Sequence, residues 1–278
     1  MLDPKSDIVF KLILSRPENE ALLRSMIEAV VELPSPIDAV TVLNPEVTRE
    51  VALLKAIVLD VRVRLSDGTL LDIEMETHPR LGLAPRFLYY WASLYAAQLG
   101  RGEDYTKLRP AISIVWLNGA IPRLVDRFHS TFHLAEDHTR AIFSDHIEMH
   151  VLCLPRLADD ALVRPELSRW ARFFLAATGE ARHALALEDP VMSKAVKELE
   201  RISREPNTLR FIDEVERARV VHSHMMATTR DEGREEGREE GRRTAMLAVA
   251  RQLLDRGTPP DEIAQLTGLD LADIPPTS

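Results

Sequence analysis

The sequence LDVRVRLSDGTLLDIEMET, residues 59–77, constrains the fold more than any other stretch of this chain. It contains two strand-like runs joined by a turn, and the second run carries Asp72, Glu74 and Glu76 at alternate positions. A β-strand sends successive side chains to opposite faces, so the three carboxylates share one face and the apolar residues between them share the other. Because neighbouring like charges destabilise a sheet, the acidic face needs an explanation.

The turn between the two runs decides which residues face each other. A two-residue turn at Asp67 and Gly68 would mix polar with apolar partners, whereas a three-residue turn with a left-handed Gly68 keeps the two faces separate. We predict the three-residue turn, because burial of one face selects the register that keeps apolar residues together. The predicted cross-strand pairs are Leu59 with Met75, Val61 with Ile73, Val63 with Leu71, Arg62 with Asp72, and Asp60 with Glu74.

In this register the Cβ atoms of Asp60 and Glu74 lie about 5 Å apart. Arg62 can neutralise Asp72, but no cation of the hairpin reaches the group formed by Asp60, Glu74 and Glu76. Carboxylates that converge in this way share a proton or hold a hard cation such as Mg²⁺. The alternative is an edge hairpin whose acids simply face water.

The character of the chain changes near residue 155. Strand-like and helical segments alternate before this point, including a continuous apolar run at residues 111–117 that is typical of a strand buried on both faces. The runs at 127–136 and 146–154 predict later, more exposed strands, and only helical patterns follow. We therefore expect an α/β core at 1–155, a helical region packing on or following it at 156–230, and a charged repeat with a small helical tail at 231–278.

Composition excludes several classes of protein. Apolar residues make up 45% of the chain and no run of eighteen of them occurs, so we expect no membrane span. We expect no secretory signal either, and the single cysteine, Cys153, predicts a buried core residue and suits a reducing compartment, so the cytoplasm is the expected location. The formal net charge of -9 gives no global attraction for nucleic acid, so any such site must be a local patch.

The tail contains the repeat GREEGREEGRR, which begins at Gly233. Three glycines cost a helix roughly 1 kcal/mol each relative to alanine, so the repeat is either a linker or a helix whose glycine stripe meets another helix, and we favour the linker. Thr258 is expected to cap a further helix that starts at Pro259. Because few basic residues follow Arg256, association with a second copy or a protein partner is the expected role of this tail.

An Asp on one strand, a hairpin, and an acid-x-residue pair on the next strand together resemble the PD-(D/E)XK nuclease motif. The surrounding sequences DIVFK, DIEME and RFLYYWASLYAAQLGRGEDYTKLRPAISIVWL resemble the Rpn family of recombination-promoting nucleases, also described as transposases. The resemblance covers about residues 5–155 and implies an α/β fold with a mixed sheet flanked by helices. The positions that match the family pattern after the acids are Arg86, Tyr89, Tyr90, Gln98, Leu99, Gly100, Tyr105 and Pro110.

The resemblance implies a Mg²⁺-dependent DNA endonuclease of recombination or mobile elements, with Mn²⁺ or Ca²⁺ as substitutes for Mg²⁺. It assigns Asp60, Glu74 and Glu76 as catalytic, and the same three with the carbonyl of Met75 as metal ligands. Glu76 is a departure, because the superfamily usually has Lys there and the family usually has Gln. The alternative is therefore a nuclease fold that has lost its chemistry and acts as a DNA- or protein-interaction module.

We expect Glu76 to be a ligand, so that Glu76→Gln lowers cleavage and higher Mg²⁺ partly restores it. Arg80 and Arg86 follow the acidic strand and predict either phosphate contacts or solvated surface arginines. The remaining candidates have two interpretations each. Asp7 and Lys11 match the family's opening pattern, although Asp7 also suits a helix N-cap. The last candidates match the family pattern, with the tyrosines serving either base stacking or helix packing: Tyr89, Tyr90 and Gln98.

Overall fold

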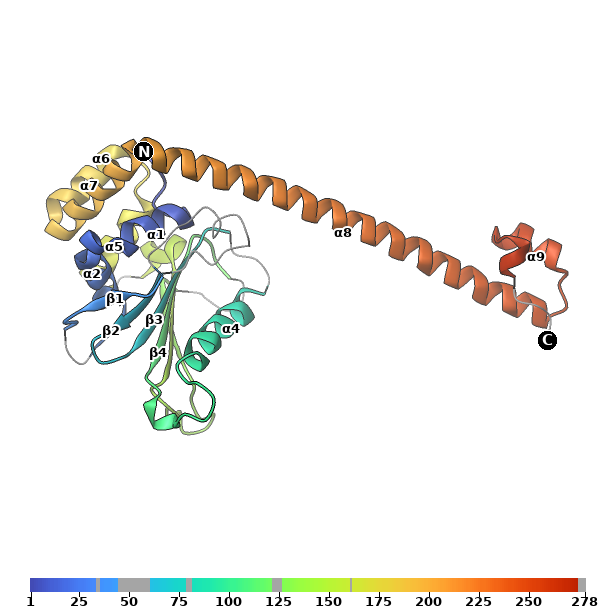
Figure 1. Cartoon of the computed structure of the whole chain (residues 1–278), viewed down its shortest axis with the longest axis horizontal. Helices are drawn as coiled ribbons and strands as arrows, with labels where there is room; N and C mark the ends of the chain where they lie inside the picture. Colours follow the sequence, from blue (N-terminus) through green and yellow to red (C-terminus); the bar gives the residue numbers. More distant parts are fainter. Residues whose placement is uncertain (34–35, 45–60, 79–81, 122–126, 161, 275–278) are drawn as a thin grey trace. The chain divides into compact units, whose positions relative to one another are not determined.

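The computed structural model describes residues 1–33, 36–44, 61–78, 82–121, 127–160 and 162–274 (Figure 1). Six strands form one mixed sheet in the order β1-β2-β3-β4-β6-β5. The β3–β4 and β4–β6 pairs are parallel and the other pairs are antiparallel. The strands are β1 (Val40–Val42), β2 (Val61–Leu65), β3 (Leu70–Glu76), β4 (Ala111–Leu117), β5 (His129–His133) and β6 (Ile147–Cys153).

Helices cover both faces of the sheet (Figure 1). One face packs against α1, α2, α5 and α7 around a large apolar core, whereas α4 lies on the other face. This arrangement and the helical C-terminal region confirm the predicted α/β fold. The α-helices are α1 (Asp7–Ser15), α2 (Glu20–Val30), α4 (Leu83–Ala96), α5 (Pro165–Leu175), α6 (Gly179–Glu188), α7 (Pro190–Arg204), α8 (Pro206–Asp255) and α9 (Pro260–Thr267). Short 3₁₀ turns occupy Pro17–Asn19, Tyr105–Lys107, Leu154–Asp159 and Leu271–Asp273.

The hairpin between β2 and β3 has the predicted three-residue turn. Gly68 has a φ of +92°, and its N–H donates to the carbonyl of Leu65 at 3.0 Å. The N–H of Leu65 in turn donates to the carbonyl of Thr69 at 2.9 Å. The pairs Val61 with Ile73, Arg62 with Asp72, and Val63 with Leu71 are all formed, which confirms the register over the described residues.

β4 is buried along its whole length, as predicted for a strand covered on both faces. The expectation that the run containing β6 is exposed was wrong. β6 lies between β4 and β5 in the sheet, so most of its residues are buried, and Cys153 is buried with them. The edge position belongs to β5, which is the more exposed of the two strands.

The chain divides into two compact units, Met1–Val215 and Glu216–Ser278. In the first unit, α5, α6 and α7 share the apolar core with α1 and α2, so these helices are packed together with the sheet. The three-part division expected from the sequence stays a prediction. None of the helices in the described part of the chain is both long and apolar enough to cross a bilayer.

The repeat GREEGREEGRR is helical, so the linker favoured from the sequence was wrong. Eight of its eleven residues are Arg or Glu, which are strong helix formers, and helix-forming sequence continues on both sides within the 50 residues of α8. Propagating an existing helix requires no new nucleation, so glycines inside it are tolerated.

The boundary between α8 and α9 also differs from the expectation. Gly257, with a φ of +81°, donates its N–H to the carbonyl of Leu254 at 2.9 Å, and Thr258 donates to Leu253 at 3.0 Å. This is a Schellman closure of α8, so Thr258 ends one helix instead of capping the next. Pro259 is the N-cap of α9.

Two histidines meet at the edge of the sheet, on β5 and β6. His129 Nε2 lies 2.9 Å from His150 Nδ1, and His150 Nε2 lies 2.8 Å from Glu148 Oε1. Burial, followed by the neighbouring charges of His150 and Arg164, lowers the pKa of His129 from 6.5 to about 4, against smaller opposing effects of Asp160 and Glu148. His129 is therefore neutral in the folded protein at neutral pH.

The left-handed turn predicts an asymmetry between two glycines. Gly68→Ala should destabilise the protein by about 1–2 kcal/mol, because a side chain is strained at positive φ, and the added Cβ would lie 3.0 Å from Arg109 Cγ. Gly179→Ala at the start of α6, where a Cβ meets nothing within 4 Å of the described atoms, should be neutral or stabilising. Urea unfolding of both variants measures the difference, and equal effects would contradict the turn assignment.

The lowered pKa of His129 predicts how stability changes with pH. Between pH 6.5 and about 4 the unfolded chain binds a proton at this position that the folded chain does not, so stability falls as pH falls through this window. His129→Gln removes the titration while keeping a side-chain amide, so its melting temperature should decline less steeply over the same range. Parallel curves for the two proteins would show that His129 does not contribute.

Candidate active site

The acidic face of β3 is the face covered by α4. Leu70, which shares this face with the acids, packs against Leu94 of α4 and Ala111 of β4. The opposite face of β3, including Ile73, faces the large core. The acids are therefore placed where the first turns of α4 pass over the sheet, so the edge hairpin facing only water is not what the structure shows.

The first two acids of β3, Asp72 and Glu74, are buried. Asp72 is buried, and its Oδ1 lies 3.7 Å from Arg62 Nε, which confirms the predicted neutralisation of Asp72 by Arg62. Glu74 is 8% exposed on the adjacent turn of the pleat. A carboxylate this buried stays ionised only when cations or hydrogen-bond donors stabilise it.

Glu76, at the end of β3, is held by two donors from outside the strand. Its Oε1 accepts the backbone N–H of His78 at 3.0 Å, and its Oε2 accepts Nη2 of Arg86 at 2.5 Å. The same Arg86 nitrogen lies 3.9 Å from Glu74 Oε2. A cation therefore does reach the acids, from α4 and not from the hairpin.

Arg86 is held by electrostatics and by its aromatic neighbours. Its guanidinium carbon lies 5.4 Å from the ring centre of Phe87 and 5.9 Å from that of Tyr90, within the range of cation–π attraction. Burial alone lowers the pKa of Arg86, but the hydrogen bond to Glu76 and the charges of Glu76 and Glu74 outweigh it, so the pKa is raised. The guanidinium is permanently charged.

Two predicted site residues, Asp60 and Arg80, lie outside the described residues, so the pairing of Asp60 with Glu74 stays a prediction. The structure does constrain the Met75 carbonyl. Asn118 at the end of β4 donates its N–H to the Glu76 carbonyl at 2.9 Å. Because successive carbonyls of a strand point to opposite sides, the Met75 carbonyl points away from β4, toward the side of β2.

These residues fit a divalent cation in part. Glu74 and the Met75 carbonyl are hard oxygen donors on adjacent residues of β3, which are the kind of ligands that Mg²⁺ prefers. Glu76, the third predicted ligand, already accepts one hydrogen bond at each of its two oxygens, and its role as a metal ligand stays a prediction. Within the described ranges, which omit Asp60, no three His, Cys, Asp or Glu residues gather as a metal site.

The secondary candidates named from the sequence lie on different elements, with Asp7 and Lys11 on α1 and the others on or just after α4. Ser6 is the N-cap of α1 and Asp7 follows it, so the N-cap interpretation of Asp7 was wrong. Lys11 of the same helix is only 2% exposed. Tyr89 is 69% exposed, so it is not packed in the core. Gln98 is structural, since its side chain exchanges two hydrogen bonds of 2.9 Å with the backbone of Arg109.

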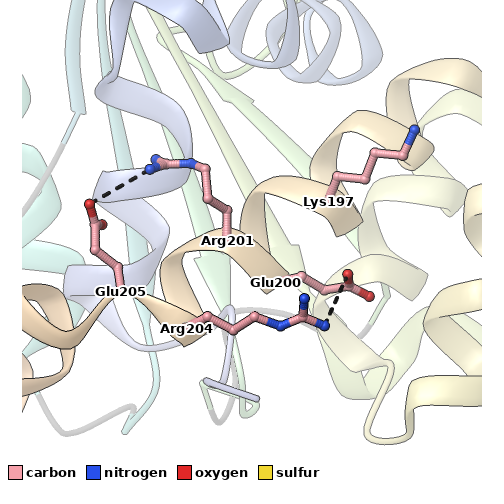
Figure 2. Close-up of a pocket in the computed structure, with 5 residues that line it drawn as sticks. All are labelled: Lys197, Glu200, Arg201, Arg204 and Glu205. Atoms are coloured by element: carbon pink, nitrogen blue, oxygen red, sulfur yellow. Dashed lines mark ion pairs between the residues drawn. The ribbon is translucent and has the colours of Figure 1, made fainter.

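A groove of about 440 Å³ lies along α7, on the helical layer opposite α4 (Figure 2). Its two acids each pair with an arginine, with Arg201 3.7 Å from Glu205 and Arg204 3.9 Å from Glu200. It shares no residue with the acidic face, so it is not part of the candidate site. The lining residues are Lys197, Glu200, Arg201, Arg204 and Glu205.

Sequence reasoning named Arg86 as a DNA contact but missed its bond to Glu76. The bond depends on where α4 begins, at Gly82, which is its N-cap and has a φ of +91°, and no sequence signal gave that position. A helix that starts there carries its first-turn residues back over the end of β3.

Comparison with known proteins gives one match. Searches against curated proteins and against solved structures returned no match. The family model described as PD-(D/E)XK nuclease family transposase matches residues 4–228, which include the sheet, α4, the helices α5 to α7 and the first part of α8. This match covers most of the chain, and the mixed sheet with an acidic third strand agrees with it. The chain belongs to the PD-(D/E)XK nuclease family transposases.

Proposed function

We propose that this protein is a metal-dependent DNA endonuclease that hydrolyses phosphodiester bonds. The observation that carries the proposal is the confirmed β2–β3 register, which supports placing Asp60 opposite the buried Glu74. Two acids that face each other across a sheet repel, and packing of the strands does not offset this repulsion. A divalent cation bound between them would.

Asp60, Glu74 and the Met75 carbonyl would hold the ion, with Mg²⁺ as the physiological choice and Mn²⁺ or Ca²⁺ as substitutes. When bound, such an ion supplies Lewis acidity toward a phosphate oxygen and lowers the pKa of a coordinated water. The protein's own part is to keep these oxygens in place on a rigid strand. Glu74 is 8% exposed, so its carboxylate is largely shielded from solvent.

Duplex DNA is the proposed partner, although the chain is acidic overall. Local cations must then meet the phosphates, and Arg86 is the described cation nearest Glu74. Arg80 precedes it in the sequence and is the second proposed contact. The Rpn resemblance extends the proposal to recombination or mobile-element biology, and the single buried Cys153 fits a cytoplasmic protein.

A second candidate is a nuclease fold that serves as an interaction module without cleaving. The observation in its favour is Glu76, which replaces the Lys or Gln of the motif and is bound by Arg86. In this case the chain would bind DNA or a protein through the same face, and metal would have no effect on the substrate.

Purified protein should nick or linearise plasmid DNA with Mg²⁺ or Mn²⁺, and EDTA should abolish the activity. Asp60→Ala and Glu74→Gln should each lower the rate by about 10²-fold or more, the scale of a lost electrostatic group in an active site. Asp72→Asn is the matched control, because Asp72 shares the strand and face of Glu74 but pairs with Arg62.

Circular dichroism of each variant separates lost chemistry from lost folding. Cleavage that persists in EDTA and in Asp60→Ala would exclude the nuclease assignment at these residues. Plasmid that is bound without cleavage under all metal conditions would favour the interaction module.

We also propose that the tail associates with a second copy of the chain. The four-residue repeat places like charges at every i, i+4 spacing on α8. Opposite charges lie at i, i+3, Glu235 with Arg238 and Glu239 with Arg242, but neither pair is in ion-pair contact in the described part of the chain. No ion pair joins the repeat residues to any other described residue, apart from Arg243 with Asp273 at 2.8 Å. The repeat therefore presents continuous charged ridges to solvent: Arg234, Arg238 and Arg242 on one side of the glycines, and Glu236 and Glu240 on the other.

The order of these ridges favours a parallel pair. Successive residues are rotated by about 100° around a helix, so the arginine ridge and the Glu236 ridge flank the glycine ridge on opposite sides. In a parallel pair, one flank of each helix faces the opposite flank of its partner, as e and g positions do in a coiled coil. Arginines then face glutamates, whereas an antiparallel pair would bring like charges together.

Light scattering after size exclusion should therefore show a dimer of the full chain that weakens as salt is raised. Replacing the three arginines by glutamate should give monomers, and replacing Glu236 and Glu240 by arginine should do the same. An equimolar mixture of the two variants should regain the dimer. A monomeric parent, or variants that remain dimeric, would contradict the parallel pairing.

A further inference from the structure

We propose that Glu76 is a positioning residue that holds the guanidinium of Arg86 beside Glu74, and that Arg86 supplies the cation that the PD-(D/E)XK motif normally places on the strand. The inference rests on the proposed nuclease function. It differs from the metal-ligand role expected for Glu76 from the sequence. It starts from the hydrogen bonds that both oxygens of Glu76 already accept.

The carboxylate of Glu76 has one orientation because both ends are held. The His78 N–H fixes Oε1 at 3.0 Å, and the Arg86 guanidinium fixes Oε2 at 2.5 Å. The side chain is 16% exposed, so solvent competes weakly for these bonds. To bind a metal ion, Glu76 would have to share an oxygen that already accepts a hydrogen bond, and at Oε2 that bond is short and charge-assisted.

Arg86 is placed where a strand cation would act. Glu76 stands two residues after Glu74 and shares its face of β3, so a cation bound to Glu76 lies next to Glu74. Arg86 Nη2 is 3.9 Å from Glu74 Oε2. The motif's Lys would be the residue at position 76 itself. In this chain the positive charge belongs to Arg86 of α4, and Glu76 at that position accepts its hydrogen bond.

Much of the guanidinium remains available to a substrate. The Arg86 side chain is 41% exposed, and among the described residues its hydrogen bond to Glu76 is its only one. A guanidinium carries five N–H donors, so the remaining donors can meet a phosphate oxygen. The ring contacts with Phe87 and Tyr90 hold the plane of the group while it does so.

The pair also removes an electrostatic difficulty. Three ionised acids at one site would repel DNA. The positive charge of Arg86 offsets the negative charge of Glu76, which leaves the charges of Asp60 and Glu74 to balance a divalent ion. Because Arg86 cannot give up its proton in a protein, its contribution is electrostatic and not that of an acid or base.

The decisive comparison uses the full chain with Arg86→Ala, Glu76→Gln and the double variant Glu76→Lys with Arg86→Ala. Arg86→Ala should lower cleavage by about 10²- to 10³-fold, the effect of removing one stabilising group from an active site. Glu76→Gln retains an oxygen that can accept from Arg86 but loses the charge of the pair, so it should lower cleavage less than Arg86→Ala does. The double variant returns the cation to the strand and should regain most of the activity lost in Arg86→Ala.

Mn²⁺ affinity, measured by electron paramagnetic resonance without DNA, provides a readout apart from activity. It should be unchanged in Glu76→Gln, because this proposal gives Glu76 no place in the metal shell. A large loss of Mn²⁺ affinity in Glu76→Gln, or a double variant as inactive as Arg86→Ala, would overturn the inference. Arg86→Lys, which keeps the charge but loses the fork of donors, should fall between Arg86→Ala and the parent.

Failure of the nuclease function itself gives a different result. A parent that never cleaves would exclude the endonuclease, and duplex binding in EDTA would then decide the placement of the cation. Weaker binding in Arg86→Ala that recovers in the double variant would support the assignment. Equal binding by the parent, Arg86→Ala and the double variant would overturn the assignment.

Discussion

The register between β2 and β3 is the constraint on which the rest of the candidate site depends. Gly68 allows the three-residue turn, and the turn brings Val61 and Val63 onto the same face as Ile73 and Leu71. A shift of one residue would expose the apolar side chains and bury the charged ones. Burial of the apolar face therefore holds the acids of β3 on the opposite face, where α4 covers them.

Two arginines from different elements, one on β2 and one on α4, pair with acids of the acidic face. Arg62 lies directly across the ladder from Asp72, so its role follows from the strand pairing. Arg86 comes from α4, ten residues after Glu76 in the sequence, and contacts both Glu76 and Glu74. The acidic face thus combines the buried Glu74 with an ion pair between Glu76 and Arg86.

The second unit follows different physics. The repeat in α8 has no apolar face, and its charged side chains are exposed. Its proposed pairing with a second copy would rest on the glycines and on the charges that flank them. This contrasts with the first unit, where apolar burial between helices and sheet determines the arrangement.

Several features followed from the sequence alone because they depend on local periodicity. Alternation along β3 and the left-handed Gly68 were sufficient for the turn, the register and the division of faces, and the apolar run of β4 was sufficient for its central place. The spaced pattern from Arg86 to Pro110 was sufficient for the family.

Tertiary structure decided what depends on the path of the chain between elements. The order of β4, β6 and β5 buries β6, which its own sequence does not reveal because the neighbouring strand, and not the pattern, removes it from solvent. The helical state of the repeat depended on the helix around it. The bond from Arg86 to Glu76 depended on where α4 begins, because only the position of Gly82 and the packing of Leu83 and Phe87 against the sheet bring that guanidinium back to the acids.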